Sequence, residues 1–90
     1  MKQKIMIIED NMITARQVSA FLNNDGYETK VYLDGESALA DFQEYAPHLV
    51  LLDYFLPGMN APDVCTSLRK LSMTPVIVLS ANTRTQDKIQ

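Results

Sequence analysis

Continuous runs of apolar residues at three places in the chain predict buried β-strands. The runs are Ile5-Met6-Ile7-Ile8, Leu49-Val50-Leu51-Leu52 and Val76-Ile77-Val78-Leu79. They do not alternate with polar residues, which is typical of parallel strands covered on both faces. Residues 27–33 alternate apolar and polar positions instead, which favours an edge strand. The pattern therefore predicts four strands, three of them suited to the interior of a parallel sheet.

The segments between the strands have the spacing of amphipathic helices. These segments are residues 12–24, 36–45 and 62–71. Asn11 is suited to cap the first helix. Ala15, Val18 and Leu22 form its apolar face, and Phe21 lies beside that face. Because strands and helices alternate, we expect an α/β domain: a doubly wound parallel sheet with helices on both faces.

Size and charge narrow the class of protein. Ninety residues are enough for one small domain, so we expect residues 1–90 to form a single unit. The net charge of −3 argues against a nucleic-acid-binding surface on this segment. One cysteine cannot form an internal disulfide and suits a reducing compartment. The first apolar run has four residues, whereas a membrane span needs about 20. We therefore expect a cytoplasmic protein with no membrane segment.

Polar side chains follow three of the predicted strands. They are Glu9 and Asp10 after the first run, Asp53 after the second, and Ser80 with Ala81 after the last. In an open parallel sheet the carboxyl ends of the strands share one edge, where ligands bind. Oxygen ligands without His or Cys favour Mg²⁺. An aspartate beside such an ion can attack phosphorus and form an aspartyl phosphate. His48 precedes a strand, at the opposite edge, and is expected to be structural.

Three motifs resemble the receiver domain of two-component response regulators. They are Ile7-Ile8-Glu9-Asp10-Asn11, Leu51-Leu52-Asp53-Tyr54-Phe55-Leu56-Pro57-Gly58-Met59 and Val78-Leu79-Ser80-Ala81. The match runs in the family's order from residue 4 to residue 90. The resemblance implies a flavodoxin-like receiver fold with strand order 2-1-3-4-5, and it implies a role in two-component signal transduction.

The resemblance also implies how a phosphoryl group would be accepted. Asp53 would be the phosphoacceptor for a histidine kinase or a phosphotransfer protein. Asp10, Asp53 and the backbone carbonyl of Phe55 would bind Mg²⁺, and Glu9 would assist directly or through water. Such a domain is not an enzyme, and its only turnover is slow self-dephosphorylation.

Two further residues would act on the phosphoryl group once it is bound. Ser80 would be the switch hydroxyl that turns towards the group, and the Ala81 amide would help to hold it. The segment Leu56-Pro57-Gly58-Met59 would shape the loop after the acceptor.

The chain departs from the family pattern in two respects. The family continues with a complete fourth helix, a fifth strand whose end carries a lysine for the phosphoryl group, and a fifth helix. Here Thr83 and Gln86 have the spacing of a helix start, and Lys88 does not match that lysine. We therefore expect a receiver that is incomplete at its C-terminus, with an output domain beyond residue 90. Second, the family often has Asp-Gly where this chain has Asn60-Ala61, which predicts a differently shaped loop because alanine resists positive φ.

Without a fifth strand, residues 76–79 would form an exposed sheet edge. An apolar strand is poorly suited to that position, because its unpaired backbone groups can pair with another chain. We therefore expect weak monomer stability, or self-association through the exposed fourth strand.

Two other functions remain compatible with the residues. The first is a receiver-like interaction or assembly module, or a fragment of one, that is never phosphorylated. The second is a magnesium-dependent phosphohydrolase with an aspartate nucleophile. Such hydrolases usually place a second acid two residues after the nucleophile, where this chain has Phe55. The partners expected for a receiver are a histidine kinase or phosphotransfer protein, with no direct contact to nucleic acid or membrane.

Overall fold

The four predicted strands form one parallel sheet. A computed structural model describes residues 2–79. The strands are β1 (Lys4–Ile8), β2 (Glu28–Tyr32), β3 (Leu49–Asp53) and β4 (Val76–Leu79). Their order across the sheet is β2-β1-β3-β4, which confirms the order that the resemblance implies for these strands. The residues that follow β4 lie outside the described part of the chain, and with them Ser80, Ala81 and the fourth helix predicted at Thr83 and Gln86.

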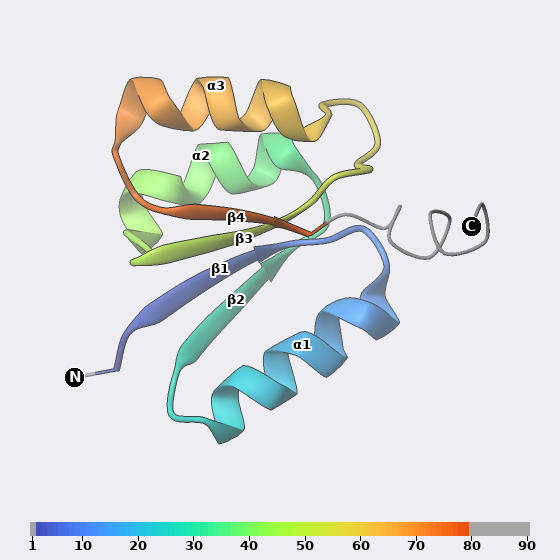
Figure 1. The fold of residues 1–90 in the computed structure, drawn as a ribbon, viewed down its shortest axis with the longest axis vertical. Coiled ribbons are helices and arrows are strands. Elements are labelled where there is room, and N and C mark those ends of the chain that lie inside the picture. The colour runs from blue at the N-terminus through green and yellow to red at the C-terminus, as the bar shows by residue number, and fades with distance from the viewer. Residues whose placement is uncertain (1, 80–90) are drawn as a thin grey trace, which may run out of the picture.

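Helices cover both faces of this sheet. They are α1 (Met12–Asn24), α2 (Gly35–Tyr45) and α3 (Ala61–Leu71). In Figure 1, α2 and α3 lie together on one face and α1 lies on the other. The doubly wound arrangement expected from the sequence is therefore confirmed. None of these three helices has the length and apolar character that crossing a bilayer requires.

An asparagine or aspartate side chain caps each helix. Asn11 Oδ1 accepts a hydrogen bond of 3.0 Å from the Thr14 amide, as predicted for α1. Asp34 caps α2 in the same way. At α3 the cap is Asn60, whose Oδ1 accepts from the Asp63 amide at 3.1 Å. Ala61 is thus the first residue of α3. It does not adopt positive φ, because Ala46 is the only non-glycine residue with positive φ within residues 2–79.

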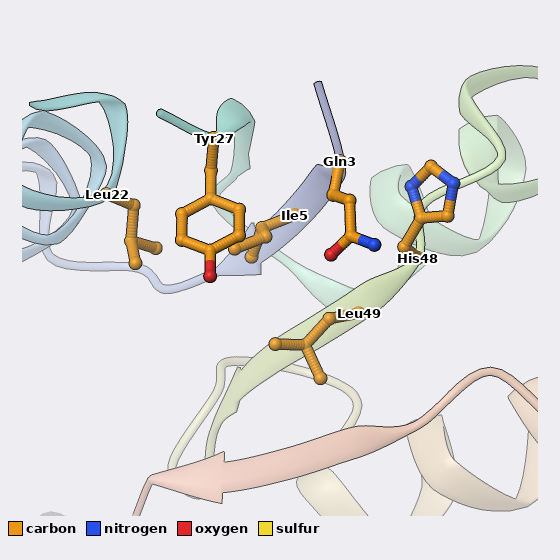
Figure 2. Close-up of a pocket in the computed structure, with 6 residues that line it drawn as sticks. All are labelled: Gln3, Ile5, Leu22, Tyr27, His48 and Leu49. Carbon is orange, nitrogen blue, oxygen red and sulfur yellow. The ribbon is translucent and has the colours of Figure 1, made fainter. Parts of the chain in front are cut away.

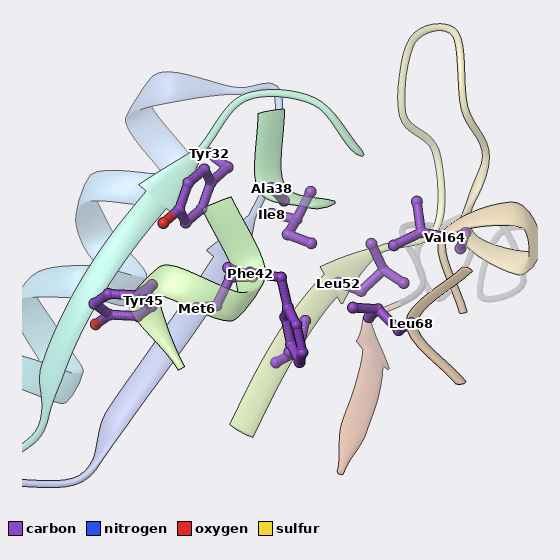
Figure 3. Packing of buried hydrophobic residues seen from close by; sticks show 11 residues of the cluster. Met6, Ile8, Tyr32, Ala38, Phe42, Tyr45, Leu52, Val64 and Leu68 are labelled. Atoms are coloured by element: carbon purple, nitrogen blue, oxygen red, sulfur yellow. The ribbon is translucent and has the colours of Figure 1, made fainter. Parts of the chain in front are cut away.

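The main hydrophobic core lies between the sheet and the α2–α3 layer. Figure 3 shows side chains of both layers meeting there. The core residues are Met6, Ile8, Tyr32, Ala38, Phe42, Tyr45, Val50, Leu52, Ala61, Val64 and Leu68. Phe42, in the C-terminal half of α2, is 4% exposed. Against this layer, β1 and β3 pair in parallel with Ile8 opposite Leu52.

The opposite face of the sheet is covered less completely. Of the predicted α1 stripe, Ala15 is fully buried, but Val18 and Leu22 are only half-buried. Phe21 is 71% exposed, so it does not belong to the core. In β4, Ile77, Val78 and Leu79 are also exposed, as expected for an apolar strand at a sheet edge.

We predict that the pKa of Asp41 reports the contact between α2 and β2. Asp41 accepts hydrogen bonds from the Tyr32 hydroxyl and, at 2.9 Å, from Lys30 Nζ, and together these lower its pKa below 3.8. A carboxyl group with a lowered folded-state pKa adds stability above its unfolded pKa, and that stability is lost as the pH falls through the folded pKa. The stability that Asp41 contributes is therefore lost at pH values below 3.8.

An NMR titration of the carboxyl groups tests this contact. Tyr32→Phe is expected to move the titration midpoint of Asp41 upward, because it removes the Tyr32 hydrogen bond, which is the main cause of the lowered pKa. Asp34, whose pKa is lowered by the Ser37 amide, is the control and should keep its midpoint. An unchanged Asp41 midpoint in Tyr32→Phe would contradict the contact.

Candidate functional site

Three carboxylates from two neighbouring strands meet at one edge of the sheet. Asp53 is the last residue of β3, and Glu9 and Asp10 follow β1 directly. Each of the three offers a carboxylate oxygen, and these oxygens lie within 4.8 Å of one another. The cluster arises because β1 and β3 are parallel neighbours with Ile8 opposite Leu52, so both strands end at the same level. We call Glu9, Asp10 and Asp53 the acidic cluster.

Backbone hydrogen bonds fix the β1 side of the acidic cluster. The Glu9 amide donates to the Tyr32 carbonyl of β2 at 2.9 Å, which extends the strand pairing beyond Ile8. Glu9 Oε2 accepts from the Asn11 amide at 3.0 Å. This turn holds Asp10 between the strand and the start of α1, where its side chain is exposed.

Asp53 is the most enclosed member of the cluster. It is 9% exposed, and its Oδ1 accepts a hydrogen bond of 3.4 Å from the Phe55 amide. The next amide, that of Tyr54, donates to the Leu79 carbonyl of β4 at 3.0 Å. The chain therefore stays paired with β4 one residue past the carboxylate, and this pairing fixes the position of Asp53.

Burial disfavours ionisation at two of the three acids. The pKa of Asp53 is raised above 3.8, first by desolvation and also by the charge of Asp10, although the Phe55 amide opposes the rise. The pKa of Glu9 is raised above 4.5, again first by desolvation, with the charge of Asp53 adding to it and the Asn11 amide opposing it. Ionised carboxylates at this spacing repel one another unless a cation lies among them.

The donor set of the acidic cluster fits Mg²⁺. All three groups are hard oxygen donors, and the cluster contains neither histidine nor cysteine. Their spacing is comparable with the roughly 4 Å between opposite ligands of an octahedral Mg²⁺. A cation there would also offset the mutual repulsion that, after desolvation, adds to the rise of the two pKa values. Of the predicted ligands, Phe55 lies two residues past Asp53, and its amide donates to Asp53 Oδ1.

The loop after Asp53 packs against α2 through a glycine. A Cβ built on Gly35 would lie 2.7 Å from Val64 Cγ2 and 3.3 Å from Met59 Cβ, so only glycine fits there. In the same loop, Gly58 has a φ of +76° and lies beside the Glu36 carboxylate. The sequence pattern indicated Gly35 only as part of a turn. No local signal could reveal its contact with Met59 and Val64, because these residues are distant in the chain.

Comparison with known proteins identifies the family. Residues 5–90 match the response regulator receiver domain. The chain belongs to this family, whose members act in two-component signal transduction.

Response regulators are also among the similar curated proteins. The chain is 42% identical over 89 residues to the DNA-binding response regulator MtrA of Mycobacterium tuberculosis H37Rv, covering 99% of this chain and 39% of that protein. It is 41% identical over 85 residues to the sensory transduction protein RegX3 of Mycolicibacterium smegmatis, covering 94% of this chain and 37% of the relative. The chain thus spans about two-fifths of the length of these relatives.

Solved receiver domains have the same fold. The BeF3-activated N-terminal receiver domain of Klebsiella pneumoniae RstA matches with a TM-score of 0.84 at 29% identity, over 88% of this chain and 68% of the other. The receiver domain of the Francisella response regulator 1452 matches with a TM-score of 0.84 at 28% identity, over 98% of this chain and 74% of that chain.

Proposed function

We propose that this chain accepts a phosphoryl group on Asp53 in a reaction that depends on Mg²⁺. The observation that carries the proposal is the acidic cluster, in which the enclosed Asp53 carboxylate lies beside Glu9 and Asp10 at the ends of β3 and β1. Membership of the receiver family supports it, since phosphoryl acceptance is typical of that family. The donor would be a histidine kinase or a phosphotransfer protein.

The proposed step exchanges one bond to phosphorus for another. An Asp53 carboxylate oxygen forms a bond to phosphorus while the bond between phosphorus and the donor's imidazole nitrogen breaks, and the electron pair leaves with that nitrogen. The Phe55 amide orients the Asp53 carboxylate through Oδ1. Asp10, Asp53 and the Phe55 carbonyl would hold Mg²⁺, with Glu9 assisting directly or through water. The ion would supply positive charge to the phosphoryl oxygens.

Other parts of the proposal concern Ser80 and Ala81, which lie outside the described residues, and the partners of the domain. The Ser80 hydroxyl would donate to a phosphoryl oxygen, and the Ala81 amide would help to hold the group. We propose that the domain is an acceptor with slow self-dephosphorylation, works in the cytoplasm, and associates with itself through its exposed fourth strand.

Incubation with a small acyl phosphate and Mg²⁺ tests the function. Intact mass and release of inorganic phosphate are followed together over time. A receiver is expected to gain one phosphoryl group and lose it slowly. Rapid and continuing phosphate release would favour a phosphohydrolase. No mass change over the whole course would favour an assembly module without phosphoryl chemistry.

Asp10→Asn is expected to weaken Mg²⁺ binding. A ligand that binds only the folded protein stabilises it, by about 1.4 kcal/mol at ten times its Kd. We expect Mg²⁺ to raise the thermal midpoint of the parent chain, and Asp10→Asn to lose most of that rise because one carboxylate of the cluster is gone. Asp25→Asn is the matched control, since Asp25 is an exposed acid at the far end of α1. Equal magnesium responses in all three chains would contradict the site.

A further inference from the structure

The loop that carries Phe55 is fixed at both ends. It begins after Tyr54, whose amide donates to the Leu79 carbonyl of β4 at 3.0 Å, and it ends at Asn60, which caps α3. In Figure 1 this loop, drawn in yellow, joins β3 to α3 at the end of the sheet where α2 begins. The other proposed Mg²⁺ ligands belong to β3 or directly follow β1. Of the ligands, only the Phe55 carbonyl therefore depends on the path of the loop.

Between these ends, side-chain contacts hold the loop against α2. Leu56 and Met59 are partly buried and pack against the main hydrophobic core. Met59 lies against Gly35, the first residue of α2: a Cβ built on Gly35 would be 3.3 Å from Met59 Cβ and 3.4 Å from Met59 Sδ. The residue before Met59, Gly58, has a φ of +76°, which glycine adopts without strain, and lies beside the Glu36 carboxylate. The end of the loop thus lies against the first two residues of α2.

The contact between Met59 and Gly35 is close enough to fix the position of Met59. The same Cβ on Gly35 would lie 2.7 Å from Val64 Cγ2, so α2, α3 and the loop meet at one tightly packed point. Attraction between apolar atoms falls steeply with distance, and a gap of about 0.5–1 Å already loses a quarter to a half of it. Moving Met59 away from Gly35 therefore costs contact energy, which favours a single path for the loop.

We propose that Met59 is a positioning residue for Mg²⁺: by packing on Gly35 it holds in place the loop whose Phe55 carbonyl binds the ion. This role rests on the proposed function, because it concerns the same ion. A ligand that is already held in place loses less conformational freedom when the ion binds, so the complex is tighter. Groups that orient a metal ligand typically change metal affinity by about 10–100-fold when they are removed. Met59 itself supplies no ligand atom.

Asp53 does not depend on Met59 in this way. Asp53 lies opposite Leu79 in the β3–β4 pairing, and the Tyr54 amide continues that pairing by one residue. Loss of the Met59 contact is therefore expected to weaken Mg²⁺ binding while the phosphoryl acceptor stays in place. Phosphoryl uptake should then require more Mg²⁺, but its rate at saturating Mg²⁺ should remain close to that of the parent chain.

Calorimetric titration with magnesium chloride tests this role, at a temperature where circular dichroism shows every variant to be folded. Met59→Ala is expected to raise the Mg²⁺ dissociation constant about 10-fold. Met59→Leu keeps an apolar side chain of similar volume, so its dissociation constant should stay within about twofold of the parental value. Gly35→Ala tests the contact from α2, because its Cβ must displace Met59 or Val64. It should also weaken binding.

Phosphoryl uptake from a small acyl phosphate, measured over the same range of Mg²⁺ concentrations, gives a second readout. For Met59→Ala the half-maximal Mg²⁺ concentration should rise with the dissociation constant, and the maximal rate should stay parental. A role in stability alone would not shift the Mg²⁺ requirement of a chain that is fully folded.

A variant that loses stability without disturbing the loop supplies the control. Leu49 begins β3 at the opposite edge of the sheet and is half-buried, as Met59 is. Figure 2 shows Leu49 beside a cavity of about 190 Å³ at that edge. Leu49→Ala should lower the thermal midpoint and yet bind Mg²⁺ as tightly as the parent chain.

Equal dissociation constants for the parent chain, Met59→Ala and Gly35→Ala would overturn the role of Met59. So would a loss of affinity in Leu49→Ala as large as that in Met59→Ala, because the effect would then reflect stability alone. A parent chain that binds no Mg²⁺ would overturn this role together with the proposed function. A parent chain that binds Mg²⁺ but takes up no phosphoryl group would contradict only the proposed function, and the dissociation constants would still decide the role of Met59.

Discussion

Asp53→Asn is expected to abolish phosphoryl uptake from a small acyl phosphate in the presence of Mg²⁺. The amide keeps the shape of the side chain and can keep the contact with the Phe55 amide, but it lacks a carboxylate oxygen able to attack phosphorus. The parent chain should gain one phosphoryl group by intact mass, whereas the variant should gain none. The expected loss is complete, because neither Glu9 nor Asp10 is held in the enclosed position that Asp53 occupies.

A second aspartate supplies the control for this experiment. Asp63 lies in the first turn of α3 and is outside the acidic cluster, so Asp63→Asn should be phosphorylated like the parent. Both variants replace an aspartate with asparagine, one inside the acidic cluster and one outside it. Phosphorylation of Asp53→Asn at the parental level would contradict the assignment of the acceptor.

Phe42→Ala is expected to cause the largest loss of stability among single substitutions in the α2–α3 layer. Phe42 is 4% exposed and packs in the core that Figure 3 shows. Removing a buried phenyl ring costs about 3–5 kcal/mol, because apolar burial is lost and a cavity remains. In a domain of 60–100 residues, 1 kcal/mol shifts the thermal midpoint by about 4–8 °C. The midpoint should therefore fall by more than about 12 °C.

The matched comparison is an exposed apolar residue on another helix. Ile13 of α1 is 70% exposed, so Ile13→Ala should change the free energy of unfolding by less than about 0.5 kcal/mol. Urea denaturation of both variants gives the two free energies. A loss below about 1 kcal/mol for Phe42→Ala would contradict the packing of the core.

Local sequence patterns predicted most of the fold. Continuous apolar runs identified β1, β3 and β4, because strands covered by neighbours need no polar positions. The alternation with helices then predicted a parallel sheet, and its carboxyl edge predicted where the acids would meet. The acidic cluster was predictable for this reason: its three members each follow a strand directly or end one.

Features that depend on packing between distant residues could not be predicted. Phe21 has helical spacing close to the apolar stripe of α1, yet it is exposed because no element of the described chain covers that flank. Gly35 belongs to a sequence typical of a turn. A glycine is required there because Val64 and Met59 leave no room for a Cβ. Asn60 followed by alanine predicted a loop shaped differently from the family's, and in the structure Asn60 caps α3. For Phe21 and Gly35 the deciding neighbours are set by the fold rather than by the adjacent sequence.

Locating the acyl phosphate in the chain tests the central claim most directly. The parent chain is incubated with Mg²⁺ and a small acyl phosphate, reduced with borohydride to convert an aspartyl phosphate to homoserine, and digested for peptide mass spectrometry. The account predicts homoserine at residue 53 and at no other acidic position. Homoserine at Asp10 or at any other aspartate would contradict the account. So would the absence of homoserine from every peptide.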